Sequence, residues 1–188
     1  MYGTIIGDIV GSIYEHHNIR NKDFELFDDS CSITDDTVMS CAIAKAMCEY
    51  KNDKDKEKFQ TKCIEYMREI GVRYISAGYG GTFLKWLVIP NPQPYNSYGN
   101  GAAMRVSSIG MLANTLEEAE ALAEISASVT HNHPEGIKGA KAMASAIWML
   151  KNGYDKMAMK EYIEQKYYSL NVDLELLKEK IGLDVSCE

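Results

Sequence analysis

The sequence predicts an all-α protein built as a compact multi-helix domain. In almost every segment, apolar residues recur with the 3.6-residue period of a helix that packs on a core, and the alternation typical of strands is almost absent. Valine and isoleucine never cluster as they do in buried parallel strands. The chain has 188 residues, 46% hydrophobic and 25% charged, which fits one globular domain with a sizeable core. We therefore expect a single domain over residues 1–188.

Nine helices are expected, with ends placed to within about two to four residues. The pattern places them at residues 2–16, 35–51, 55–77, 81–88, 102–114, 116–130, 135–152, 155–169 and 172–181. The clearest apolar stripe is formed by Phe59, Cys63, Tyr66 and Ile70, whose spacing puts all four on one helix face. Two long loops are expected, at 17–34 and 89–101. Loops of this length are uncommon in a compact helical domain unless they are functional or disordered, so we look for the site where they enter helices.

Charge and composition exclude several classes of partner. The formal net charge is −7 and the lysines are interleaved with acidic residues, which disfavours binding to a nucleic-acid backbone. No apolar run approaches the ~18 residues of a membrane span, and Asp8 interrupts the N-terminal apolar stretch. The five cysteines form no C-x-x-C pair and suggest neither a disulfide framework nor a zinc site. We expect a cytoplasmic protein with no nucleic-acid or membrane partner.

The first expected helix carries glycines at a strict spacing of four: Gly3, Gly7 and Gly11. Each glycine within a helix costs about 1 kcal/mol relative to alanine, which favours a close approach of another backbone to this stripe. Asp8 and Glu15 share one face of the same helix. A carboxylate on a closely packed helix must be paired, hydrogen-bonded or metal-bound.

The second helix is preceded by Thr34-Asp35-Asp36-Thr37. Thr34 can cap this helix, and acids in a first turn are stabilised by about 0.3–1 kcal/mol each. Two adjacent carboxylates between two hydroxyls also form an all-oxygen cluster of the type that Mg²⁺, Mn²⁺ and Ca²⁺ prefer. Helix capping and metal binding both stay open here.

Two further motifs lie at loop-to-helix junctions. Tyr98-Gly99-Asn100-Gly101-Ala102-Ala103-Met104-Arg105 leads from a loop into small helix-forming residues, which indicates either a plain turn or free N–H groups for an anion such as a phosphate. Thr130-His131-Asn132-His133-Pro134-Glu135-Gly136 starts the helix at 135–152, with Pro134 suited to a first position. Its two histidines are either hydrogen-bonded or ligands.

Together the motifs closely resemble one known family. In order, the chain carries Gly7-Asp8-x-x-Gly11-Ser12-x-x-Glu15, Thr34-Asp35-Asp36-Thr37, Gly99-Asn100-Gly101-Ala102-Ala103-Met104-Arg105 and Thr130-His131-x-His133-Pro134-Glu135-Gly136. This order is similar to that of the ADP-ribosylglycohydrolases, which include the dinitrogenase reductase-activating glycohydrolases. The resemblance runs from Gly3 to about Lys151.

The resemblance implies an all-α fold around a cleft that holds two Mg²⁺ or Mn²⁺ ions in a complete family member. It implies hydrolysis of the bond between the anomeric ribose carbon of ADP-ribose and a protein side chain or small acceptor. The implied metal-site residues are Thr34, Asp35 and Asp36 together with Glu15, and the implied catalytic residues are Glu15, which assists proton transfer, and Asp36. The residues implied to bind ADP-ribose are Gly99, Asn100, Gly101 and Met104, with His133 at the distal ribose or diphosphate.

The C-terminal part departs from the family pattern. Family members usually carry a late Asp-x-Asp-Thr motif that completes the metal pair, and the aspartates after Lys151 are Asp155, Asp173 and Asp184. We therefore expect a domain that is incomplete at its C-terminus, with an incomplete metal site. Two alternatives to the hydrolase stay open: a non-catalytic ADP-ribose- or nucleotide-binding relative, and a helical interaction protein. An exposed apolar face could also be covered in a homo-oligomer.

Overall fold

The computed structural model describes residues 1–15, 17, 19, 21, 23–173 and 176. Within these residues the chain forms α-helices and two short 3₁₀ helices and no strand, which confirms the predicted all-α class. The elements are α1 (Tyr2–Gly11), η1 (Ser12–Tyr14), α2 (Asp35–Asp53), α3 (Lys56–Arg73), α4 (Gly81–Val88), η2 (Asn100–Ala102), α5 (Ser107–Leu112), α6 (Leu116–Ser128), α7 (Pro134–Lys151) and α8 (Lys156–Lys166). No helix of the described part is both long and apolar enough to cross a membrane.

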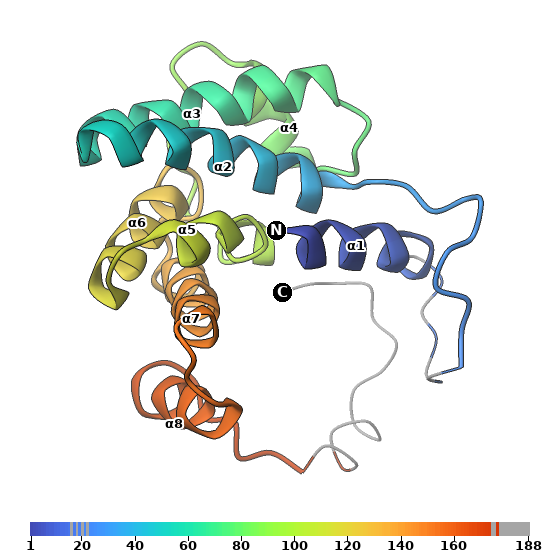
Figure 1. The fold of residues 1–188 in the computed structure, drawn as a ribbon. Coiled ribbons are helices and arrows are strands. Elements are labelled where there is room, and N and C mark those ends of the chain that lie inside the picture. Colours follow the sequence, from blue (N-terminus) through green and yellow to red (C-terminus); the bar gives the residue numbers. More distant parts are fainter. Residues whose placement is uncertain (16, 18, 20, 22, 174–175, 177–188) are drawn as a thin grey trace.

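Helices α2 and α3 lie side by side and antiparallel, and α4 packs on α3 (Figure 1). Helices α6 and α7 form a second pair, and α5 contacts both α2 and α7. Helix α1 packs on α2, and α8 packs on α7 at the other end of the molecule (Figure 1). The two peripheral helices therefore flank a central group formed by α2, α3, α5, α6 and α7.

The hydrophobic core fills this central group. The predicted stripe on α3 is confirmed, because Phe59, Cys63 and Tyr66 are buried and Ile70 packs against the core. The largest other contributions come from Met39, Ile43, Met47, Met67, Trp86, Leu87, Ile109 and Leu122, all at most 2% exposed. Burial of each such side chain contributes about 1.5–3 kcal/mol, so this group holds the scaffold of the site in place.

Side chains cap most helix starts. Thr34 Oγ1 accepts a hydrogen bond from Asp36 N at the start of α2, as the capping interpretation predicted. Asp55 and Thr115 do the same for α3 and α6. At α7, His133 Nδ1 accepts from Glu135 N at 3.1 Å. Each such cap contributes on the order of 1 kcal/mol.

The prediction of one helix over 102–114 is wrong. The chain there forms η2, a turn over Ala103–Arg105 and then the short helix α5. Arg105 lies in the turn with its side chain fully buried, and its guanidinium donates to Ser126 O and to Thr130 Oγ1 on the neighbouring segment. The hydrogen bonds of Arg105 to this neighbouring segment accompany the break in the helix at residues 103–106. Most of the helix expected at 172–181, namely residues 174–175 and 177–181, lies outside the described residues.

The prediction of a backbone closely approaching the glycines of the first helix is also wrong for the described part of the chain. A Cβ added at Gly3, Gly7 or Gly11 would meet no described atom within 4 Å. Helix α1 contains no buried residue. The close approach occurs at Gly110 of α5, where a Cβ would lie 2.7 Å from Ala144 O of α7.

Candidate functional site

Two cavities meet beside the start of α2. The first, here the glycine-loop cavity, has a volume of about 440 Å³ and lies against the loop before η2. The second, here the carboxylate cavity, has a volume of about 550 Å³ and lies between α1 and α2. They share four lining residues, Asp35, Gly80, Asn100 and Met104. The two hollows are therefore adjoining parts of one site.

Four carboxylates line the carboxylate cavity: Asp8, Glu15, Asp35 and Asp36. Asp8 Oδ2 accepts hydrogen bonds from the backbone of the α2 start, from Thr34 N at 2.9 Å and from Thr37 N at 3.2 Å. The Thr34 hydroxyl donates to Asp8 Oδ1. Asp8 thus ties α1 to α2 through hydrogen bonds.

The acids of this cavity shift each other's protonation. Burial raises the pKa of Asp35 to about 7, and the negative charge of Asp36 adds to the effect, with smaller contributions from Glu15 and Asp8. Burial also raises the pKa of Asp36, followed by the charges of Asp8 and Glu15. Such an excess of negative charge is relieved by a proton or by a cation.

An all-oxygen donor set of this charge suits a hard divalent cation. Within the described residues, no three His, Cys, Asp or Glu side chains converge as a ligand group. Asp35 and Asp36, with the Thr34 oxygen, fit the common arrangement in which Mg²⁺ is held by one or two carboxylates and keeps several waters. The residues present therefore fit a hydrated cation more closely than a cation fully enclosed by protein ligands.

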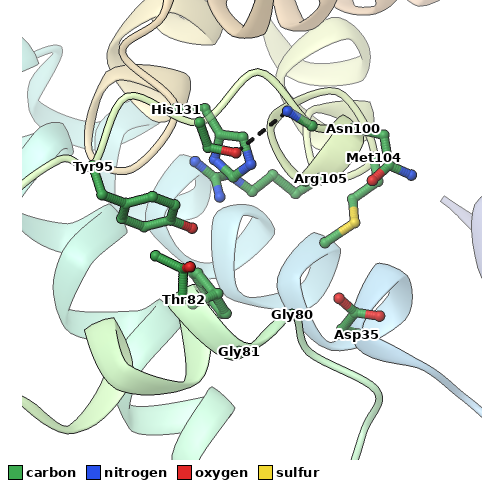
Figure 2. Close-up of a pocket in the computed structure, with 13 residues that line it drawn as sticks. Asp35, Gly80, Gly81, Thr82, Tyr95, Asn100, Met104, Arg105 and His131 are labelled. Atoms are coloured by element: carbon green, nitrogen blue, oxygen red, sulfur yellow. Dashed lines mark hydrogen bonds between the residues drawn. The ribbon is translucent and has the colours of Figure 1, made fainter. Parts of the chain in front are cut away.

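About half of the residues that line the glycine-loop cavity belong to the chain from Tyr95 to Met104. Tyr95 N donates to Thr130 O, and this bond fastens the loop to the segment after α6. Met104 N donates to Asn100 O and closes the turn at η2. In Figure 2, Asp35 lies on one side of the cavity near the Met104 side chain, and Tyr95 lies on the opposite side.

Arg105 is a buried cation in the wall of this cavity (Figure 2). Its Nη2 donates to Thr130 Oγ1 at 3.0 Å, and its Nη1 has no hydrogen-bond partner. No carboxylate of the described residues forms an ion pair with it. His131 lies next to Arg105, and burial followed by the Arg105 charge lowers the pKa of His131 to about 3.

The structure brings most of the expected site residues together. The carboxylate cavity contains Glu15, Thr34, Asp35 and Asp36, and the glycine-loop cavity contains Gly99, Asn100, Gly101 and Met104. His133 lines neither cavity; its ring packs on Tyr98 with centroids 5.4 Å apart and its Nδ1 caps α7.

Sequence reasoning gave the ligand role in this motif to His133, whereas His131 is the histidine that lines the glycine-loop cavity. Gly80, Gly81 and Thr82 line it as well and were also missed. The sequence pattern Gly80-Gly81 at the start of a helix could have indicated these three residues. Nothing in the local pattern distinguishes a buried His131 from an exposed one.

A model of the ADP-ribosylglycohydrolase family matches residues 1–181. The chain belongs to this family.

Several curated proteins are similar to this chain. The ADP-ribosylhydrolase ARH3 of Xenopus tropicalis is 26% identical over 186 residues, which cover 88% of this chain and 52% of that protein. ARH3 of Homo sapiens is 27% identical over 177 residues, which cover 80% of this chain and 48% of that protein. ARH3 of Mus musculus is 25% identical over 189 residues, which cover 87% of this chain and 50% of that protein. The chain thus spans about half the length of the curated relatives it matches.

Proposed function

We propose that this chain is a metal-dependent hydrolase that cleaves the glycosidic bond between ADP-ribose and a protein side chain or small acceptor. The single observation that carries the proposal is the joining of the two cavities at Asp35, Asn100 and Met104. One ligand in which a diphosphate is joined to a reactive ribose fits such a divided site. Family membership and the printed names of the relatives support the same substrate.

The glycine-loop cavity suits the diphosphate end. Arg105 places a positive charge in its wall, and no carboxylate of the described residues pairs with it, so an anion in the cavity lowers the cost of that buried charge. Asn100 offers a carboxamide at the junction of both cavities. The acidic carboxylate cavity would repel the phosphates and so orients the ligand with its reactive ribose toward α2.

The carboxylate cavity suits the reaction itself. Asp35 and Asp36, with Thr34, would hold Mg²⁺ or Mn²⁺, and two ions are expected in a complete family member. When bound, the cation polarises ribose hydroxyls and lowers the pKa of a coordinated water. Glu15 is exposed at the cavity and accepts the proton of the water that attacks the anomeric carbon. The bond from that carbon to the acceptor breaks, the water oxygen stays on the ribose, and Glu15 passes the proton it took to the departing acceptor.

A second candidate is ADP-ribose binding without catalysis. It is favoured by the lack of three converging ligand side chains within the described ranges, because a cation held by two carboxylates orients ribose and water less firmly. In this case the same cavities hold the ligand and the carboxylates serve only to bind it.

One experiment separates the two functions. The protein is incubated with ADP-ribosyl-arginine and ADP-ribosyl-serine peptides with and without Mg²⁺, and ADP-ribose binding is measured by calorimetry on the same sample. We expect metal-dependent release that is lost in Glu15→Gln and in Asp36→Asn, while Glu117→Gln on the exposed side of α6 behaves as wild type. Binding without release selects the second candidate, and neither binding nor release contradicts both.

The metal assignment is tested separately by Mn²⁺ calorimetry. We expect Mn²⁺ binding in the wild type and its loss in the double variant Asp35→Asn, Asp36→Asn. Unchanged binding in the double variant contradicts the assignment and leaves helix capping as the role of these residues.

A further inference from the structure

We propose that Arg105 and Thr130 are positioning residues that hold His131 as its neutral Nε2–H tautomer, so that the glycine-loop cavity presents a permanent hydrogen-bond donor to a phosphoryl oxygen. The choice of a phosphoryl oxygen rests on the proposed function, and the tautomer itself follows from hydrogen bonds within the chain. In Figure 2, the side chains of Arg105 and His131 lie beside each other at the cavity wall.

Arg105, Thr130 and His131 form a chain of hydrogen bonds, and Arg105 fixes its direction because a guanidinium donates hydrogen bonds and accepts none. Its Nη2 lies 3.0 Å from Thr130 Oγ1, which must therefore accept. The Thr130 hydroxyl has one proton of its own, and His131 Nδ1 lies 2.7 Å away. No other acceptor for this hydroxyl occurs among the described residues, so the proton points to His131 Nδ1.

A ring nitrogen that accepts a hydrogen bond carries no proton, so the neutral His131 ring is protonated at Nε2. This second nitrogen lies at the glycine loop: a Cβ placed on Gly101 would be 2.9 Å from it. Nε2 has no hydrogen-bond partner in the part of the chain that the structure describes. The N–H is therefore available to a ligand in the cavity that Gly101 and His131 both line.

The groups that face the ring keep it neutral. Burial and the Arg105 charge lower the pKa of His131 to about 3. From the loop, Tyr95 packs on the ring with centroids 5.8 Å apart, and burial raises the pKa of this phenol to about 12. Behind Arg105, burial raises the pKa of the Cys63 thiol to about 12. The residue of α7 that lies against the His131 backbone is Gly136, which carries no charge.

Because none of these groups changes its charge between pH 5 and pH 9, the donor stays in place over that range. A ligand atom with lone pairs is accepted at this point, and a ligand atom that can only donate is rejected. A phosphoryl oxygen meets this requirement. It also carries a negative charge that partly neutralises the buried Arg105 guanidinium, which forms no ion pair within the described residues.

The tautomer is tested by ¹⁵N nuclear magnetic resonance of the full chain labelled at histidine, without ligand, from pH 5 to pH 9. We expect one histidine with the Nε2–H pattern and no titration, which disappears in His131→Gln. In Thr130→Val this signal should shift to a tautomer mixture, and Thr130→Ser, which restores a hydroxyl, should restore it. Titration of His131 near pH 6.5 in the wild type overturns the proposal, and so does an unchanged pattern in a folded Thr130→Val variant.

The ligand part is tested by ADP-ribose calorimetry on the same proteins. At pH 5.5 and at pH 8 alike, we expect about tenfold weaker binding in Thr130→Val than in the wild type and recovery in Thr130→Ser, as expected for one misplaced hydrogen bond. Asp35, with a pKa of about 7, titrates in all three proteins, so the ratio of their Kd values reports on His131. If the Nε2–H tautomer is found and ADP-ribose does not bind, the proposed function fails and the positioning role stands. If ADP-ribose binds equally well to all three proteins, the donor role of His131 fails and the proposed function stands.

Discussion

Gly101 is the residue on which the shape of the glycine-loop cavity most directly depends. A Cβ at this position would lie 2.9 Å from both Cε1 and Nε2 of His131, closer than side-chain atoms normally approach, so Gly101→Ala must displace the ring or the loop. We expect at least about tenfold weaker ADP-ribose binding, since misplacement of a binding group by about 1 Å is costly. Calorimetry measures the Kd of the variant.

Gly139→Ala is the matched control for this prediction. A Cβ there would make ordinary contacts at 3.6 Å to the Tyr168 hydroxyl and 3.9 Å to the Ala103 Cβ. This variant should bind as the wild type does. Equal Kd values for Gly101→Ala and Gly139→Ala, with both proteins folded, would contradict the placement of the ligand.

Asp35 should make the stability of the metal-free protein depend on pH. Its pKa is about 7 in the folded protein, raised from the usual 3.8 by burial first and then by the charge of Asp36. The folded state therefore holds a proton that the unfolded state has released, and the free energy of unfolding should fall as the pH rises from about 4 to about 7. Asp35→Asn should remove most of this fall and stabilise the protein more at pH 8 than at pH 4. Urea unfolding in the presence of a chelator measures the difference, and equal pH profiles would contradict the shift.

The residue types of the site could be predicted from the sequence, whereas the choice between equivalent neighbours could not. Asp35, Asp36 and Asn100 follow from short motifs at loop-to-helix junctions, and the structure places them at one site. The sequence reasoning chose His133, whereas His131 lines the cavity, because Tyr95 and the buried Arg105, both distant in sequence, lie beside the His131 ring. Such tertiary burial leaves no trace in local spacing.

Helix α8 is held to the rest of the molecule by a cluster of donors around one carboxylate. Glu120 of α6 accepts hydrogen bonds from Lys166 Nζ at 2.6 Å, from Tyr162 and Tyr167 hydroxyls at 2.5 and 2.6 Å, and from Ser145 Oγ at 3.2 Å. Burial alone would raise the pKa of Glu120, but the hydrogen bonds from Lys166, Tyr162 and Tyr167 and the charge of Lys166 lower it to about 2. The stabilisation is therefore present above about pH 4.5 and is lost as the pH falls toward 2.

Glu120→Gln should destabilise the protein by about 1.5–3 kcal/mol at pH 7, the usual range for hydrogen bonds to a charged group. The difference from the wild type should shrink as the pH is lowered from about 4.5 toward 2. Glu124→Gln is the control, because Glu124 on the same helix is half-exposed and forms a surface ion pair with Lys141, at 2.8 Å. Thermal unfolding compares the three proteins, and equal midpoints for both variants at pH 7 would contradict the role of Glu120.

At the scale of elements, periodicity predicts helices that bury one face and fails where a polar contact interrupts them. The stripe along α3 could be read from Phe59 and Cys63 because every turn contributes to the same core. The expected helix over 102–114 is broken because the buried Arg105 must reach Ser126 and Thr130. In the same way, glycine spacing in α1 predicted a close contact that occurs instead at Gly110, where α5 crosses α7.

At the scale of the whole molecule, the site is divided between the central helices and the periphery. Asp35 and Asp36 begin α2, which is anchored in the core, whereas Asp8 and Glu15 lie on and just after helix α1, which buries no residue. The three hydrogen bonds that Asp8 accepts from the start of α2 tie the two parts together. A ligand that occupies both cavities should therefore also order α1 against α2.

The central claim is that the two cavities form one ADP-ribose site, and amide hydrogen exchange with and without saturating ADP-ribose and Mg²⁺ tests it most directly. The account predicts slower exchange in three segments that are distant in sequence: the start of α2 at 34–37, the loop and η2 at 95–104, and the segment at 130–136. Protection should be weaker in Gly101→Ala at the same ligand concentration. Protection of none of the three segments, or protection confined to other parts of the chain, would contradict the claim.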